Sequence, residues 1–418
     1  MTISLSFRAF LRRLPLSFPL SFSSVVFLCH FPLSFSSVVF LCRFPLSFSS
    51  VVFLCRFPLS FSSVVFLCRF PLSFSSFFSR SPGFVTFLSV SGQSSGPIPA
   101  EKFNIVTEQK SPVISDRQKA DQMKSKVYFS EDVSPESVVR LYKALNIELE
   151  GRIAVKIHSG EEGNTNFLRP EFWKPMVDEV KGTITECNTA YGDRFGGVRD
   201  TTESHIRLLE SHGWSKMFTV DLMDAEGPDA ELDIPDGKRL KKNYVGKNMM
   251  NYDSMLVLAH FKGHPMGGYG GALKQLSIGC ASSAGKALIH SCGRSDDRIK
   301  AWDVHGDLNE FPESMADAAA SVVRHFGKNI AFINVMKNLS VDCDCVTTPE
   351  APCMKDIGIL ASTDPVAVDQ ACIDLIMNAG DPGKDHFMER VNSRNGIRTI
   401  EAAEELGCGS REYELIKM

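Results

Sequence analysis

The densest group of chemically reactive side chains in this sequence lies in one glycine-rich segment. His260, Lys262 and His264 stand two residues apart, after the apolar run 254–259, and five glycines fall within the nine residues 263–271. A Gly-rich turn that opens a helix presents backbone N–H groups to an anion, and nearby lysines add positive charge. We expect Lys262 to act in catalysis or to bind an anionic substrate. The residues expected to bind an anion or cofactor are Gly267, Gly268, Gly270, Gly271 and Lys274.

Neither of the common nucleotide-binding motifs fits this segment. A Walker A loop would need Lys in place of Tyr269, and GxGxxG would need Gly in place of Leu273. His260 and His264 would share one face of a helix, but the intervening glycine and the following proline favour a loop. An isolated histidine is more often structural than a ligand, whereas two histidines beside a lysine and a Gly-rich turn favour a site. We therefore treat His260 and His264 as candidate metal ligands.

A second reactive group is the run Asp342-Cys343-Asp344-Cys345, a short distance after the apolar run 330–335. Thiolates at positions i and i+2 of an extended segment point to opposite faces, so they chelate one ion only where the chain turns. Cys343 and Cys345 are candidate ligands of a transition metal or an iron–sulfur cluster. The alternatives are a redox-active thiol pair or small buried side chains. A conventional ferredoxin cluster is not expected, because the sequence contains no CxxCxxCxxxC motif.

Two further apolar runs end in polar residues. His158 and Glu161 follow the run 152–157 and offer a general base or metal ligands, so we assign them to catalysis. Glu186 stands in the run 183–187, where a strand should still bury its side chains, and it is a candidate metal ligand. The alternative for the first group is a solvated loop.

The elements that must position these groups alternate between strand and helix patterns. The alternation predicts an α/β fold with a mainly parallel or mixed sheet and helices on both faces. In such sheets ligands bind beyond the carboxyl ends of the strands, where the four polar groups should meet. Strands are expected at 152–157, 183–187, 217–221, 254–259, 330–335 and 357–361. Helices are expected from Pro135 and at 170–181, 199–212, 270–277, 313–326, 365–378, 384–392 and 399–406.

The first hundred residues differ from the remainder. A 13-residue unit, FPLSFSSVVFLC plus His or Arg, begins at residue 18 and repeats, and residues 1–100 contain no Asp or Glu. This period is shorter than that of known solenoid repeats, so we expect a non-globular leader. The alternatives are a cleaved targeting segment and a membrane anchor. We divide the chain into these repeats at 1–100, a linker at 101–123 and a folded body at 124–418, with Met123 as an alternative start.

Charge and cysteine content restrict what the body does. Residues 101–418 hold 38 Lys and Arg against 49 Asp and Glu, a formal charge of −11. Such an acidic body excludes a general nucleic-acid binder, which needs a basic face. Eight cysteines in about 300 residues are too few for a disulfide scaffold and indicate a reducing compartment. We expect the body in the cytoplasm or an organelle matrix, without membrane association.

Several segments, in order, resemble the domain-of-unknown-function 362 family, which is often catalogued as uncharacterised iron–sulfur centre proteins. The resemblance covers about residues 124–418 and rests on KVYFSEDVSPES, AVKIHSGEEGN, ECNTAYGDR, HFKGHPMGGYGGALK, VDCDC and DIGILASTDPVAVDQA. Many relatives carry a ferredoxin-like insert after the segment that matches 285–290, where this chain has only a short polar stretch. The resemblance implies a metal- or redox-associated α/β protein of the short form that lacks the insert, and it implies no particular reaction.

These observations lead to one main hypothesis and two alternatives. The main hypothesis is a metal-binding or iron–sulfur redox protein or enzyme with a small anionic substrate. The first alternative is a non-catalytic binding protein for a phosphorylated or anionic metabolite, and the second is an interaction subunit for an electron-transfer protein such as a ferredoxin. In the main hypothesis one site gathers His158, Glu161, Glu186, His260, Lys262, His264, Cys343 and Cys345.

Overall fold

The computed structural model describes residues 124–418, apart from residues 228 and 305, and the backbone of seven short strands between residues 2 and 79. The chain forms two compact units, residues 1–109 and 110–418. Apart from these strands, the predicted leader and the linker at 101–123 lie outside the described residues. The seven strands are β1 (Thr2–Ser6), β2 (Pro15–Leu16), β3 (Ser24–His30), β4 (Ser37–Arg43), β5 (Ser50–Arg56), β6 (Ser63–Arg69) and β7 (Phe78–Ser79).

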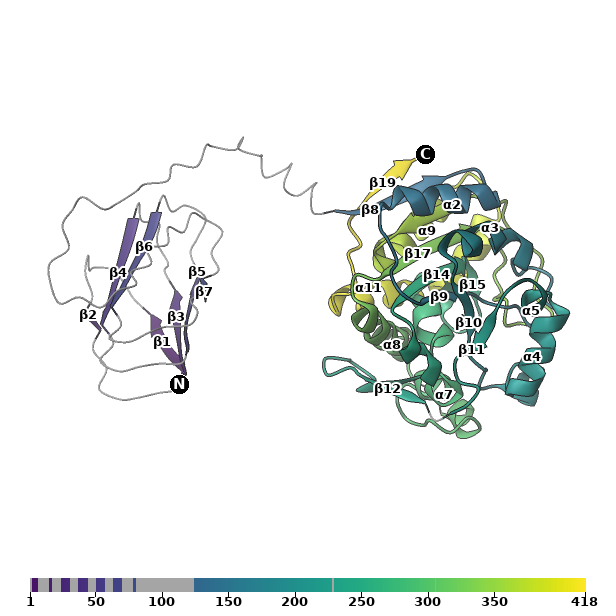
Figure 1. Cartoon of the computed structure of the whole chain (residues 1–418), viewed down its shortest axis with the longest axis horizontal. Helices are drawn as coiled ribbons and strands as arrows, with labels where there is room; N and C mark the ends of the chain where they lie inside the picture. The colour runs from purple at the N-terminus through teal and green to yellow at the C-terminus, as the bar shows by residue number, and fades with distance from the viewer. Residues whose placement is uncertain are drawn as a thin grey trace. The chain divides into compact units, whose positions relative to one another are not determined.

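The second unit is built on a mixed sheet of eight strands in the order β11-β10-β9-β14-β17-β18-β8-β19 (Figure 1). The five strands from β11 to β17 are parallel, whereas β18 runs antiparallel to both neighbours and β19 is parallel to β8. Their bounds are β8 (Ser125–Ser130), β9 (Ile153–Lys156), β10 (Thr183–Glu186), β11 (Val220–Leu222), β14 (Ser254–His260), β17 (Ile330–Met336), β18 (Gly358–Ser362) and β19 (Tyr413–Lys417).

Helices cover both faces of this sheet, which confirms the predicted α/β fold. Side chains alternate between the two faces of a strand. In β14, Met255 and Val257 therefore pack into a core with α8, α9, α10 and α11. Leu256 and Leu258 pack into the opposite core with α2, α3, α4 and α5. These helices are α2 (Pro135–Ala144), α3 (Pro170–Val180), α4 (Thr202–Ser211), α5 (Trp214–Met217), α8 (Glu310–Phe326), α9 (Pro365–Asn378), α10 (Lys384–Ser393) and α11 (Ile397–Glu405).

Two helix starts follow the sequence signals closely. The side chain of Ser134 accepts a hydrogen bond from the Ser137 amide, and that of Asp364 accepts from two amides of α9. In both helices proline occupies the first position, which suits its fixed φ and missing N–H. The helix expected at 270–277 is different: it consists of a short α6 (Ala272–Lys274) and a π-helical turn, η3 (Gln275–Gly279).

The remaining elements are short. None of the helices in the described part of the chain has the length and apolar character that a membrane span requires. The short remaining elements include two hairpins, β12 (Ala230–Asp233) with β13 (Lys242–Val245) and β15 (Lys262–His264) with β16 (Gly268–Gly270). The others are one helix, α7 (Ser283–His290), and three 3-10 turns, η1 (Gly192–Phe195), η2 (Lys247–Asn251) and η4 (Lys300–Asp303).

Candidate functional site

The four polar groups meet at one edge of the sheet, because β9, β10, β14 and β17 are adjacent and parallel. Hydrogen bonds join the segments that follow them. The Ser159 amide donates to Glu186 Oε1 at 2.9 Å, and the Glu161 amide donates to the Asp344 carbonyl at 2.8 Å. His260 Nδ1 lies 2.9 Å from Asp344 Oδ1.

Three side chains at this edge could hold a metal ion. The ligand atoms of His264, Cys343 and Cys345 all lie within 4.8 Å of one another, and we call these residues the triad. The two thiols converge because the chain turns here: the Val346 amide donates to the Cys343 carbonyl at 2.9 Å. Asn164 supports the turn by donating its side-chain amide to the Val346 carbonyl at 2.8 Å.

The thiol of Cys343 ionises readily. Burial opposes ionisation, but a hydrogen bond from Cys345 and the charges of Lys274 and Lys262 outweigh it and lower the pKa of Cys343 well below its usual value. Lys274 Nζ lies 3.5 Å from Cys343 Sγ. The same hydrogen bond, together with burial, raises the pKa of Cys345. In the metal-free site Cys343 is thus the thiol that ionises first, and Cys345 keeps its proton longer.

In metal-free protein, replacing Lys274 by Met should raise the pKa of Cys343, because the thiolate loses its nearest cation. The measurement is the ultraviolet absorbance of the thiolate as a function of pH. Cys343→Ser removes this titration and so identifies it. Lys174→Met, on an exposed ion pair, is the control and should leave the curve unchanged. An unaltered titration in the Lys274 variant contradicts the thiolate–ammonium pair.

His264 is a neutral imidazole. Burial, followed by the nearby Lys274 charge, lowers its pKa well below the usual value. Its Nδ1 accepts hydrogen bonds from the amides of Gly267 at 2.8 Å and Met266 at 3.3 Å. The proton therefore sits on Nε2, which can bind a metal only after this proton is lost or moves to Nδ1.

His260 is separated from the triad by its hydrogen bonds. Its Nδ1 faces the Asp344 carboxylate, and its Nε2 lies 2.6 Å from the carbonyl oxygen of Lys337. Lys262 Nζ binds the same carboxylate at 2.9 Å. Burial raises the pKa of Asp344, but the charges of His260 and Lys262 outweigh it and lower the pKa overall. Both predicted site residues thus hold Asp344, between the two cysteines, in place.

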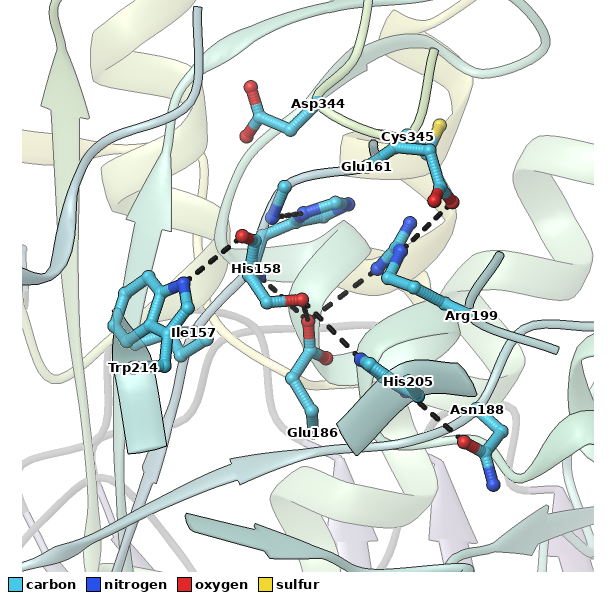
Figure 2. Close-up of polar contacts among 12 residues, drawn as sticks. Ile157, His158, Glu161, Glu186, Asn188, Arg199, His205, Trp214, Asp344 and Cys345 are labelled. Carbon is cyan, nitrogen blue, oxygen red and sulfur yellow. Dashed lines mark hydrogen bonds and ion pairs between the residues drawn. The ribbon is translucent and has the colours of Figure 1, made fainter. Parts of the chain in front are cut away.

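Glu161 belongs to a buried network with Arg199 and Glu186, close to Cys345 of the triad (Figure 2). Its carboxylate accepts hydrogen bonds from Tyr191 OH at 2.7 Å and from Arg199 Nε at 3.0 Å. Tyr191 OH also lies 3.3 Å from the carbonyl oxygen of Cys345. Burial opposes ionisation of Glu161, but Arg199 and these hydrogen bonds lower its pKa. A carboxylate bound on so many sides is suited to positioning its neighbours.

Glu186 lies deeper in the same network. Its Oε2 is 2.7 Å from Lys156 Nζ, and its Oε1 is 3.7 Å from Arg199 Nη1. Ser159 Oγ lies 3.1 Å from Glu186 Oε1 and 3.4 Å from His205 Nε2. These contacts direct the Glu186 carboxylate toward Lys156. Among the described residues, Glu186 is not part of the group that could hold a metal ion.

His158 stands at the end of β9, half-buried, with its Nδ1 accepting from the Gly160 amide at 3.1 Å. Burial and the charges of Arg199 and three lysines lower its pKa well below the usual value. It is therefore a neutral imidazole surrounded by cations. Such a group can accept a proton or donate a hydrogen bond to a bound anion.

The glycine-rich segment binds a carboxylate of the protein itself. The amides of Ala272 and Leu273, at the start of α6, donate to Asp369 at 2.8 and 3.0 Å. A Cβ at Gly271 would lie 2.4 Å from Asp369 Oδ1, so this position requires glycine. Burial raises the pKa of Asp369 to about 6. The prediction that these amides bind an external anion stays a prediction.

The other predicted glycines make room for close packing. Gly268 has φ +78° and lies against the backbone of Gly396 and Val391. Gly270 lies opposite Lys262 in the β15–β16 hairpin, and a Cβ there would be 3.7 Å from Lys262 Cε and 3.6 Å from Lys274 Cδ. Both distances are ordinary van der Waals contacts, so the aliphatic parts of both lysines pack against Gly270.

Around the triad the chain buries four cations and three carboxylates. Lys274 differs from the other three cations, because its ammonium contacts the Cys343 sulfur. A buried ammonium needs a counter-charge, which the Cys343 thiolate or an anionic ligand supplies. The carboxylate contacts of the other cations are Lys156 with Glu186, Arg199 with Glu161 and Lys262 with Asp344.

Three residues around the triad, Lys156, Arg199 and Tyr191, were not predicted from the sequence. Lys156 had a visible signal, because it is a cation inside an otherwise apolar strand. Arg199 and Tyr191 had none, since they lie in an irregular segment and reach Glu161 only through the fold.

Comparison with known proteins identifies the family. A search of curated proteins gave no significant match. The lactate racemase apoprotein from Thermoanaerobacterium thermosaccharolyticum is 15% identical over 51% of each chain, so the match spans about half of that protein, with a TM-score of 0.32. A structural-genomics protein from Thermotoga maritima is 10% identical over 65% of this chain and 58% of its own, with a TM-score of 0.29. Neither similarity carries an argument about function.

A family comparison identifies the chain. The profile of the family described as "Domain of unknown function (DUF362)" matches residues 153–374. This range begins at β9 and ends within α9, and it contains the triad and every member of the buried network of Glu161. The matched range is more than half of the 418 residues, and the chain therefore belongs to the DUF362 family.

Proposed function

We propose that this protein binds a soft transition-metal ion, of the zinc or iron class, through His264, Cys343 and Cys345. The observation that carries the proposal is the convergence of their ligand atoms within 4.8 Å, in a chain that also lowers the pKa of one thiol. Thiolate and imidazole are the ligands that these metals prefer, with bonds of roughly 2.0–2.3 Å. Small side-chain movements bring the three atoms to that distance from one ion.

Metal binding by His264 has a cost in hydrogen bonds. Binding through Nε2 moves the ring proton to Nδ1 and breaks the hydrogen bonds from the Gly267 and Met266 amides. A buried donor left without an acceptor costs about 1–3 kcal/mol. Structural zinc sites gain on the order of 10 kcal/mol. The gain from metal binding therefore exceeds the loss of these two hydrogen bonds.

We propose further that the site is catalytic and takes a small anionic substrate. Catalytic zinc sites commonly use three protein ligands and leave one position for water or substrate, where the metal acts as a Lewis acid. When a metal binds Cys343, the Lys274 ammonium beside it can attract an anion. His158 is the candidate proton acceptor, Lys262 holds Asp344, and Glu161 positions Tyr191 and Arg199.

A second candidate function, a redox-active dithiol, is favoured by one observation. Cys345 hydrogen-bonds to the Cys343 thiolate, which is the arrangement of an attacking thiolate beside its partner thiol. Oxidation by a disulfide substrate would form a Cys343–Cys345 disulfide and release two thiols from that substrate. This function requires no metal, so metal content separates the two candidates.

The test is metal analysis of the full-length protein purified without oxygen. We expect about one equivalent of zinc or iron, the stoichiometry of a single site. The double variant Cys343→Ser, Cys345→Ser should lose it. Cys353→Ser is the matched control, because this half-buried cysteine lies outside the triad. Metal-free protein that forms a reversible Cys343–Cys345 disulfide would overturn the metal proposal in favour of the dithiol.

A further inference from the structure

Three aromatic side chains form a partly exposed cluster beside the triad. The rings of Phe195 and Trp302 meet edge to face with centroids 5.1 Å apart, and Tyr191 lies 6.4 and 6.5 Å from them. Phe195 is 56% exposed and Trp302 is half-buried. Exposed large aromatic side chains that contact one another are typical of a surface that binds something.

The first connection between this cluster and the triad runs through Tyr191. Its hydroxyl contacts the Cys345 carbonyl and Glu161, while its ring contacts Phe195 and Trp302. A Cβ at Gly197 would lie 2.1 Å from the Tyr191 ring, so the ring packs directly on this backbone. Tyr191 is thereby held with one end at the triad and its ring in the cluster.

The second connection is independent of the first and begins at His264. A Cβ at Gly267 would lie 3.4 Å from His264 Nδ1 and 3.5 Å from the Phe311 ring. The Phe311 and His290 rings meet at a tilt with centroids 5.0 Å apart, and the His290 and Trp302 rings meet likewise at 4.8 Å. Aromatic side chains therefore connect the cluster to the triad twice. Tyr191 leads to Cys345, and His290 and Phe311 lead to Gly267 beside His264.

We propose that the ligand of this site is a small aromatic carboxylate. This inference rests on the proposed function and adds the substrate class. The carboxylate binds beside Lys274 once a metal shares the Cys343 thiolate that otherwise neutralises this ammonium. The flat ring packs against Phe195 and Trp302, which offer both an aromatic edge and a face.

Tryptophan fluorescence provides a specific reporter for this binding. The chain has three tryptophans. Trp173 and Trp214 are 2% and 0% exposed, whereas Trp302 is half-buried in the cluster. A ligand that contacts the cluster therefore changes the emission of Trp302, and calorimetry gives the Kd without depending on that residue.

The experiment compares benzoate, cyclohexanecarboxylate and acetate on the full-length, zinc-loaded protein. Benzoate should bind about tenfold more tightly than acetate, the gain expected from one aromatic contact, and should alter the Trp302 emission. Equal affinities for benzoate and acetate overturn the inference. Equal affinities for benzoate and cyclohexanecarboxylate overturn its aromatic part.

Variants then locate the contact. Phe195→Leu with Trp302→Leu should reduce benzoate affinity to the level of acetate and leave zinc content unchanged. Met377→Ala, which removes another exposed apolar side chain, is the control and should leave benzoate affinity unchanged. A benzoate preference that survives in the double variant overturns the inference.

The two proposals fail in different ways. If the protein binds no metal but keeps the benzoate preference, the metal centre is wrong and the aromatic ligand stands. If zinc binds in one equivalent and all three carboxylates bind equally, the metal centre stands and the ligand class is wrong.

Discussion

Replacing Glu186 by Gln is expected to lower the free energy of unfolding by about 3–5 kcal/mol, because the Lys156 ammonium remains buried without its counter-charge. The two groups lie 2.7 Å apart, and both side chains are almost fully buried. Gln keeps the shape of Glu, so the loss reports charge and not packing. Chemical denaturation of the full-length protein, followed by circular dichroism, measures it.

The pH dependence of this difference has a definite sign. Burial opposes ionisation of Glu186, but Lys156 and Arg199 outweigh it and lower its pKa from 4.5 to about 2. A carboxyl whose pKa is lower in the folded state stabilises fully above its unfolded pKa, and this contribution disappears as pH falls through the folded pKa. The difference between wild type and Glu186→Gln should thus be constant at neutral pH and shrink as pH falls from 4.5 toward 2.

A surface ion pair provides the matched control. Lys174 and Asp178 lie 2.6 Å apart on α3, with side chains 49% and 59% exposed. Asp178→Asn should cost less than about 1 kcal/mol, as exposed pairs do. Adding Lys156→Met to Glu186→Gln should recover part of the loss, because it removes the unpaired charge. If Glu186→Gln costs no more unfolding free energy than Asp178→Asn, the buried Lys156–Glu186 pair does not stabilise the protein.

The fold was largely predictable because its signals are local. The apolar run before His260 and the cap at Asp364 each specify an element from a few neighbouring residues. The parallel order of the strands then places their polar ends together. The helix expected at 270–277 begins only at Ala272, where Asp369, about a hundred residues away, accepts hydrogen bonds from the first amides of α6. The sequence of residues 270–277 alone gives no sign of that contact.

The division of roles within the site was less predictable. His260 and His264 look equivalent in the sequence, yet His260 binds Asp344 and His264 lies with the cysteines. His260 and Lys262 are two residues apart in extended backbone and so share a face, which brings both to Asp344. The convergence of Cys343 and Cys345 likewise depends on a turn that is held from outside by Asn164.

Gly263 lies where the strand that carries His264 approaches the segment that carries Cys343. Replacing it by Ala should lower both stability and metal affinity. Its amide donates to the Ser340 carbonyl at 2.8 Å, and a Cβ would lie 2.2 Å from Val341 O and 2.5 Å from Val341 Cα. Backbone atoms cannot rotate away as a side chain can, so we expect a loss of about 1–3 kcal/mol or more in unfolding free energy. The strand β15 must then move away from the segment that carries Cys343.

That movement separates His264 from the cysteines, so zinc affinity should fall by about 10–100-fold, the effect typical of losing support around metal ligands. Competition with a chelator measures the affinity, and thermal unfolding measures the stability. Gly380→Ala is the control, because Gly380 is exposed and a Cβ there meets nothing within 4 Å. Wild-type zinc affinity in Gly263→Ala would mean that the close approach of β15 does not assemble the triad. A loss confined to this variant would show that one missing side chain lets two distant segments share a metal ion.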